Sequence, residues 1–144
     1  MTDIRNISVP ALAYLGDCVI EMCVREHLVD TGLSTSAHLN AEALHFVRAS
    51  AQAEAMKRIM PHLTEVEASY FRRGRNVGHT NVPKRATVGE YRTATGMEVL
   101  FGYLHLTKQN ARIQELFQIG YFLKENITQN PSEERNDTNE QSKN

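Results

Sequence analysis

Residues 9–24 read Val9-Pro-Ala-Leu-Ala-Tyr-Leu-Gly-Asp-Cys-Val-Ile-Glu-Met-Cys-Val24, an apolar stretch whose only charges are Asp17 and Glu21. Four residues separate the two acids, so on a helix they share one face. A buried carboxylate costs several kcal/mol unless a cation or a hydrogen-bond donor meets it. We therefore expect Asp17 to be buried and to have a partner that offsets this cost.

The rest of the chain also reads as helix, because the alternation of β-branched and polar residues that is typical of strands is missing. Ser8 is a good N-cap and Gly32 a good C-terminal stop for the first helix. Thr64 and Thr87 each begin a capping-box pattern, and Pro61 ends the helix before it. Helices are predicted over residues 9–29, 37–60, 64–75, 87–108 and 111–124. The predicted fold class is an all-α helical bundle.

Composition predicts one domain and a polar tail. Residues 1–124 hold fourteen Lys and Arg against twelve Asp and Glu, whereas residues 125–144 hold two against five and a single sizeable apolar residue. The tail is therefore expected to be solvated and disordered.

No apolar run reaches the roughly 18 residues that span a bilayer, and no signal peptide is apparent, so we expect a cytoplasmic protein. Cys18 and Cys23 are expected to be small buried hydrophobes rather than a disulfide or zinc site.

Glu98 is a second acidic residue that, like Asp17, lies within a largely apolar helical stretch. Gly16, Gly96 and Gly102 weaken their helices, which indicates that the helices of Asp17 and Glu98 pack closely and bring the two acids together. Mg²⁺ would relieve their repulsion, because it prefers oxygen ligands and keeps several waters.

Two alternatives stay open at the acidic residues. Each carboxylate could instead bond a backbone group, a histidine or an arginine. Glu21 could be a metal ligand, a supporting group or the partner of Arg25 one turn later.

A basic stretch lies between the helices, since residues 68–89 contain no acid. Such a segment attracts a phosphate backbone, although a solvated loop without a ligand is the alternative. The expected RNA-binding residues are Arg72, Arg73, Arg75, Asn76, Lys84, Arg85 and Arg92. Together, the acids and the basic loop indicate a phosphodiester substrate.

At these residues the chain resembles the ribonuclease III family. Residues 13–21, Ala-Tyr-Leu-Gly-Asp-Cys-Val-Ile-Glu, are similar to its signature helix, and residues 98–104, Glu-Val-Leu-Phe-Gly-Tyr-Leu, to its second acidic motif. The resemblance is closer to the short branch, mini-ribonuclease III, which has no double-stranded-RNA-binding domain. The Arg-Gly-Arg-Asn segment at 73–76 and the Tyr-Arg-x-x-Thr start at 91–95 match that branch.

The resemblance implies an all-α endonuclease domain that forms a homodimer and cuts double-stranded RNA with Mg²⁺, for which Mn²⁺ can substitute, leaving 5′-phosphate ends. It implies Asp17 and Glu98 as catalytic metal ligands, supported by Glu21, and Tyr14 as a dimer contact. The implied substrate is the precursor of the large-subunit (23S) ribosomal RNA, with a ribosomal protein that presents the RNA as a further partner.

Two positions depart from the longer enzymes, which have a glutamate where this chain has Ala13 and an aspartate where it has Thr95. The short branch shares both changes, which predict weaker metal binding with more water ligands. They also leave open a non-catalytic double-stranded-RNA-binding dimer, and a purely structural helical dimer is a third reading.

Overall fold

The computed structural model describes residues 3–77 and 85–123. Within these ranges all of the regular secondary structure is helical, as the sequence predicts, and the predicted tail lies outside them. Six α-helices and two short 3-10 helices are present in this part of the chain. They are η1 (Ile4–Asn6), α1 (Val9–Asp30), α2 (Ser36–Val47), α3 (Ala49–Ile59), η2 (Met60–His62), α4 (Glu65–Arg75), α5 (Val88–Leu106) and α6 (Asn110–Tyr121).

Most helix ends follow the predicted capping residues. The Ser8 side chain accepts a hydrogen bond from the backbone of Ala11, and Gly32 has the positive φ of 90° that suits a C-terminal stop. Thr64 begins a complete capping box, as predicted. At Thr87 only the N-cap bond from Glu90 forms, because the Glu90 carboxylate accepts from the Thr87 hydroxyl instead of from its backbone N–H.

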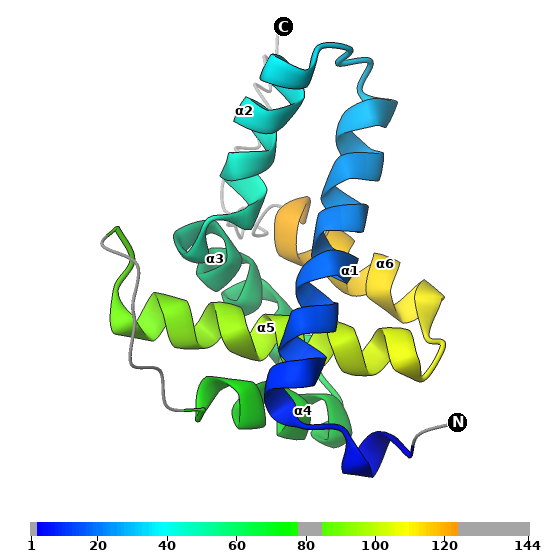
Figure 1. Cartoon of the computed structure of the whole chain (residues 1–144), viewed down its shortest axis with the longest axis vertical. Coiled ribbons are helices and arrows are strands. Elements are labelled where there is room, and N and C mark those ends of the chain that lie inside the picture. Colours follow the sequence, from blue (N-terminus) through cyan, green and yellow to red (C-terminus); the bar gives the residue numbers. More distant parts are fainter. Residues whose placement is uncertain (1–2, 78–84, 124–144) are drawn as a thin grey trace, which may run out of the picture.

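The single helix predicted over residues 37–60 is wrong, because it breaks at Arg48. That residue has φ −59° and ψ 145°, ending α2 and beginning α3. α2 lies beside the C-terminal half of α1 and buries no residue fully, whereas α3 turns into the core and buries Met56 and Ile59 (Figure 1). One straight helix could not meet both packing demands.

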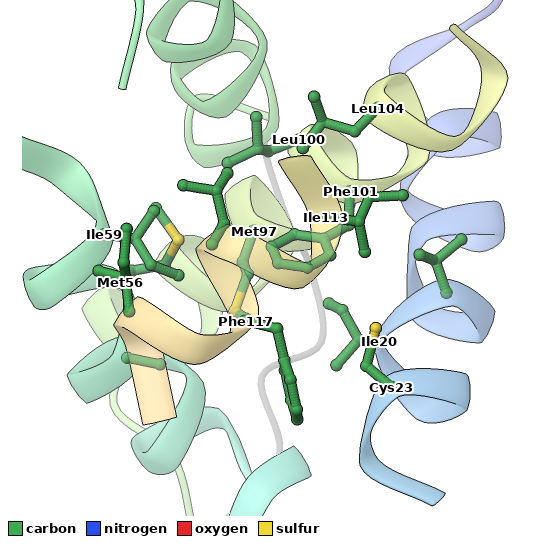
Figure 2. Close-up of a cluster of buried hydrophobic side chains, with 14 of the residues drawn as sticks. Ile20, Cys23, Met56, Ile59, Met97, Leu100, Phe101, Leu104, Ile113 and Phe117 are labelled. Carbon is green, nitrogen blue, oxygen red and sulfur yellow. The ribbon is translucent and has the colours of Figure 1, made fainter. Parts of the chain in front are cut away.

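α5 crosses the middle of the molecule and supplies much of the core. Its residues Met97, Leu100, Phe101 and Leu104 are fully buried. Side chains from three other helices surround them, as Figure 2 shows: Ile20 and Cys23 from α1, Met56 and Ile59 from α3, and Ile113 and Phe117 from α6. A helix covered on several sides is apolar around most of its circumference, which makes the polar Glu98 on α5 conspicuous.

Two glycines let α1 and α5 touch backbone to backbone. A Cβ on Gly16 would lie 1.6 Å from the carbonyl oxygen of Glu98, and one on Gly102 would lie 2.2 Å from that of Leu12. The predicted close packing of these helices is therefore confirmed. Gly96 serves a different contact, because its added Cβ would meet Phe71 of α4 at 2.6 Å.

A buried ion pair, which the sequence analysis missed, ties α4 to α6. Glu67, only 4% exposed, accepts hydrogen bonds from Arg112 through both carboxylate oxygens at 2.8 and 2.9 Å. Arg112 also donates to the carbonyl of His62 at 2.7 Å. Because Glu67 is also the acidic member of the capping box, one side chain fixes both the start of α4 and its position against α6.

The two cysteines differ in exposure. Cys23 is buried as expected, but the expectation for Cys18 is wrong, since it is exposed on α1. Neither forms a disulfide in the described structure. Among residues 3–77 and 85–123, no helix has the length and apolarity that a membrane crossing needs.

Candidate metal and RNA site

The close contact between α1 and α5 brings Asp17 and Glu98 together. Asp17 follows Gly16, whose Cα packs against the backbone of Glu98. Glu98 is half-buried, and burial raises its pKa to about 7, with the negative charge of Asp17 as a second cause. Each acid therefore lies within electrostatic reach of the other, as the sequence predicts.

Asp17 itself is not buried, which corrects the sequence-based expectation. It lies on the outward side of α1, next to the exposed Tyr14 and Cys18. Neighbouring protein still desolvates its carboxyl in part, and the charge of Glu21 adds repulsion, so the pKa of Asp17 is raised. The apolar residues that surround Asp17 in sequence misled the prediction, because several of them also face outward.

The charges around the pair suit a bound cation. No described residue donates a hydrogen bond or an ion pair to the Glu98 carboxylate. The nearby Arg25 is engaged elsewhere, since its Nε lies 3.0 Å from Oε2 of Glu21. Glu21 is therefore the partner of Arg25, which is one of the roles that the sequence left open for it. Two repelling carboxylates without a described counter-charge fit Mg²⁺, which takes few protein ligands and keeps its waters.

Within the described ranges, no third metal-binding side chain joins Asp17 and Glu98. Among residues 3–77 and 85–123, no group of three or more His, Cys, Asp or Glu side chains is placed to hold a metal ion. Ala13 is buried in an apolar cluster with Leu12, Tyr70 and Val99, and Thr95 is buried with its hydroxyl donating to the carbonyl of Tyr91 at 3.1 Å.

The C-terminal turn of α4 carries basic residues to the same part of α5. A Cβ on Gly74 would lie 2.7 Å from the Cα of Gly96 and 2.8 Å from the carbonyl of Thr95. Thr95 precedes Glu98 by one helical turn, so the end of α4 is fixed beside the acidic pair. The residues around Gly74 are largely open to solvent: Arg72, Arg73 and Asn76 are exposed and Arg75 is half-buried.

The remaining basic residues surround the start of α5. Arg85 precedes the helix and Arg92 lies in its second turn, and both are exposed. Lys84 lies outside the described residues. The structure thus brings the end of α4 and the start of α5 to one side of the acidic pair.

Two arginines at the end of α4 rest on aromatic rings. The Arg73 guanidinium carbon lies 4.7 Å from the centroid of Tyr70, and that of Arg75 lies 5.7 Å from the centroid of Phe71. Tyr70 in turn stacks on Tyr103 of α5 at 4.0 Å and 14°. Sequence analysis missed these contacts, although an aromatic residue three or four positions before each arginine is a spacing that allows them.

The outward face of α1 carries three large exposed apolar side chains among its charged residues. Tyr14 is 84% exposed, and Met22 and Val29 are 57% and 64% exposed. Large apolar side chains on the exposed side of a helix are typical of a contact surface.

An all-α domain with two neighbouring carboxylates close to a basic helix end has the features of a metal-dependent nuclease. The comparisons with known proteins identify the family. A model of the ribonuclease III domain matches residues 10–109. The chain belongs to the ribonuclease III family, as the motifs predicted, and its enzyme class is therefore that of an endoribonuclease.

Its relatives point to the short branch of the family. The chain is 42% identical over 118 residues to mini-ribonuclease 3 of Enterococcus faecalis, covering 81% of this chain and 89% of that protein. It is 45% identical over 107 residues to mini-ribonuclease 3 of Symbiobacterium thermophilum, covering 74% and 82%. A crystal structure of a Fusobacterium nucleatum protein superimposes with a TM-score of 0.74 at 30% identity, covering 83% of this chain and 95% of that one.

Proposed function

We propose that this protein is a Mg²⁺-dependent endoribonuclease that cleaves double-stranded RNA and leaves 5′-phosphate ends. The observation that carries the proposal is the Asp17–Glu98 pair. Burial, and after it the negative charge of Asp17, raise the pKa of Glu98 to about 7, and no described cation lies against the pair to relieve this. Ionising both carboxylates is unfavourable in the metal-free protein, and a bound divalent ion would offset this free-energy cost.

Asp17 and Glu98 would hold the ion, and Mn²⁺ would satisfy the same oxygen ligands. The ion would supply Lewis-acid stabilisation of the charge that develops on the phosphodiester. The chain's own contribution is to hold the two carboxylates on rigid helices, because the contact at Gly16 and Gly102 fixes α1 against α5. Glu21 would support the metal site from the next turn of α1. Its ion pair with Arg25 reduces the repulsion between the carboxylates of Glu21 and Asp17.

Double-stranded RNA would lie across the end of α4 and the start of α5. The basic side chains there are expected to contact phosphates and to read the shape of the A-form helix rather than its sequence. They are Arg72, Arg73, Arg75, Asn76, Lys84, Arg85 and Arg92.

The working form would be a homodimer. Tyr14 projects from an exposed apolar face of α1, which offers a contact surface for a second copy. A two-fold dimer would present two acidic sites, one for each strand of a duplex.

The substrate would be the paired stem of the 23S ribosomal RNA precursor, in the cytoplasm. This part of the proposal rests on the similarity to mini-ribonuclease 3 proteins. A ribosomal protein that presents the RNA would add to the affinity that the basic side chains of α4 and α5 provide.

Cleavage of a long RNA duplex in Mg²⁺ and in EDTA tests the proposal. We expect cuts only with the metal, and 5′-phosphate ends on the products. Replacing Asp17 or Glu98 by its amide should abolish cleavage and spare duplex binding. An enzyme that binds the duplex without cutting it in Mg²⁺ would instead establish the non-catalytic alternative, and one without affinity at low salt would be the structural dimer.

A further inference from the structure

A column of three side chains runs from the body of the protein to its basic surface. Tyr103 on α5 is half-buried and stacks face to face on Tyr70 of α4, at 4.0 Å between ring centroids. Tyr70 is only 7% exposed. The exposed Arg73 lies over the same Tyr70, 4.7 Å from its ring centroid.

The two tyrosines of this column are fixed by packing. Tyr70 belongs to a buried cluster with Leu12, Ala13 and Val99, and Tyr103 packs against that cluster. The two rings are therefore held in place by three helices, α1, α4 and α5. A guanidinium placed over the face of an aromatic ring is attracted by the ring quadrupole and loses rotational freedom.

The neighbouring arginine provides a contrast. Arg72 is also exposed and is adjacent in sequence, but no aromatic ring or acid among the described residues contacts its guanidinium. The two side chains thus carry the same charge on the same turn of helix and differ in how firmly they are held.

We propose that Tyr70, supported by Tyr103, is a positioning residue for RNA, which holds the Arg73 guanidinium ready for a phosphate of the duplex. This inference rests on the proposed function, specifically on a phosphate contact by Arg73. A planar guanidinium that is ordered before binding loses less side-chain entropy when its N–H groups meet a phosphate. The Arg72 guanidinium, which no ring orders beforehand, would lose more side-chain entropy when it contacts a phosphate.

A double-mutant cycle on duplex affinity tests the inference. Binding of an RNA duplex is measured in EDTA, so that no cleavage occurs, for Tyr70→Leu, Arg73→Ala and the double variant. We expect Tyr70→Leu to weaken binding by about 3- to 10-fold when Arg73 is present and not to change it when Arg73 is replaced. The matched control is the same cycle with Arg72→Ala, in which the loss from Tyr70→Leu should be unchanged.

Two further variants separate positioning from a general effect on folding. Tyr70→Phe keeps the ring, and since no described residue hydrogen-bonds to the Tyr70 hydroxyl, affinity should be retained. Arg73→Lys keeps the charge but not the planar group, so it should lose affinity to nearly the same extent as Tyr70→Leu. If Tyr70→Leu proves too unstable to assay, Arg73→Lys can still be compared with the wild type and with Tyr70→Phe, both of which should bind the duplex more tightly.

The outcomes distinguish this inference from the proposed function. If Arg73→Ala leaves duplex affinity and its salt dependence unchanged, the phosphate contact itself is refuted. If Arg73→Ala weakens binding but Tyr70→Leu costs the same with and without Arg73, only the positioning role is refuted. Full affinity in Arg73→Lys would also contradict the positioning role.

Discussion

Replacing Glu98 by glutamine should stabilise the metal-free protein at high pH. In the folded state the carboxyl has a pKa of about 7 instead of its ordinary 4.5, because burial and then the charge of Asp17 oppose its ionisation. The stability that this group contributes is fully present below pH 4.5 and is lost as the pH rises through 7. Glutamine is neutral at every pH and does not suffer this loss.

The magnitude follows from the size of the pKa change. A rise from 4.5 to about 7 corresponds to at most about 3 kcal/mol lost by the wild-type protein above pH 7. Because Glu98 is only half-buried, solvent screening lowers this value, and we expect about 1–3 kcal/mol. The gain of Glu98→Gln should therefore be small at about pH 5 and reach that range at about pH 8.

Urea unfolding in EDTA at fixed protein concentration measures this gain. Glu21→Gln is the matched control, since Glu21 is already paired with Arg25 and should show no comparable gain at high pH. Added Mg²⁺ should stabilise the wild type and not Glu98→Gln, because only the former has both ligands. A gain that is absent, or equal at both pH values, would refute the assignment of a strained carboxylate pair.

Three other substitutions test the fold and the assembly. Gly16→Ala should destabilise by more than about 4 kcal/mol in thermal unfolding, because its Cβ would lie 1.6 Å from the carbonyl oxygen of Glu98; an unchanged Tm would contradict the packing. Glu67→Gln should cost about 2–4 kcal/mol in urea unfolding, since it leaves the charge of Arg112 without its buried partner, and a neutral effect would show that the pair contributes nothing. Tyr14→Ala should weaken self-association in sedimentation analysis but change monomer stability by less than about 0.5 kcal/mol, because the residue is exposed; unaltered association would exclude it from the dimer contact.

Local chemistry in the sequence was sufficient for most of the helices and for the meeting of the two acids. Ser8 and Thr64 act through hydrogen bonds to residues three positions away, so their effect is visible in sequence. Gly16 and Gly102 indicated a close helix contact because glycine within a helix has few other uses. That contact then brings Asp17 to Glu98.

The features that were missed depend on tertiary packing. Nothing near Arg48 marks a helix break, and the break follows from the need of α2 and α3 to pack on different partners. The exposure of Asp17 was missed because several of the apolar residues around it in sequence, such as Tyr14 and Met22, also face outward. The Glu67–Arg112 ion pair joins residues 45 apart, so no local pattern could predict it.

The most direct test of the account is the rate of duplex RNA cleavage in a single turnover, measured over a range of Mg²⁺ concentrations for Asp17→Asn, Glu98→Gln and the double variant. If the two carboxylates act as one metal site, either amide should lose nearly as much rate as both together, and excess Mg²⁺ should restore only part of it. Rate losses that multiply independently, or an active Asp17→Asn enzyme, would contradict the shared site.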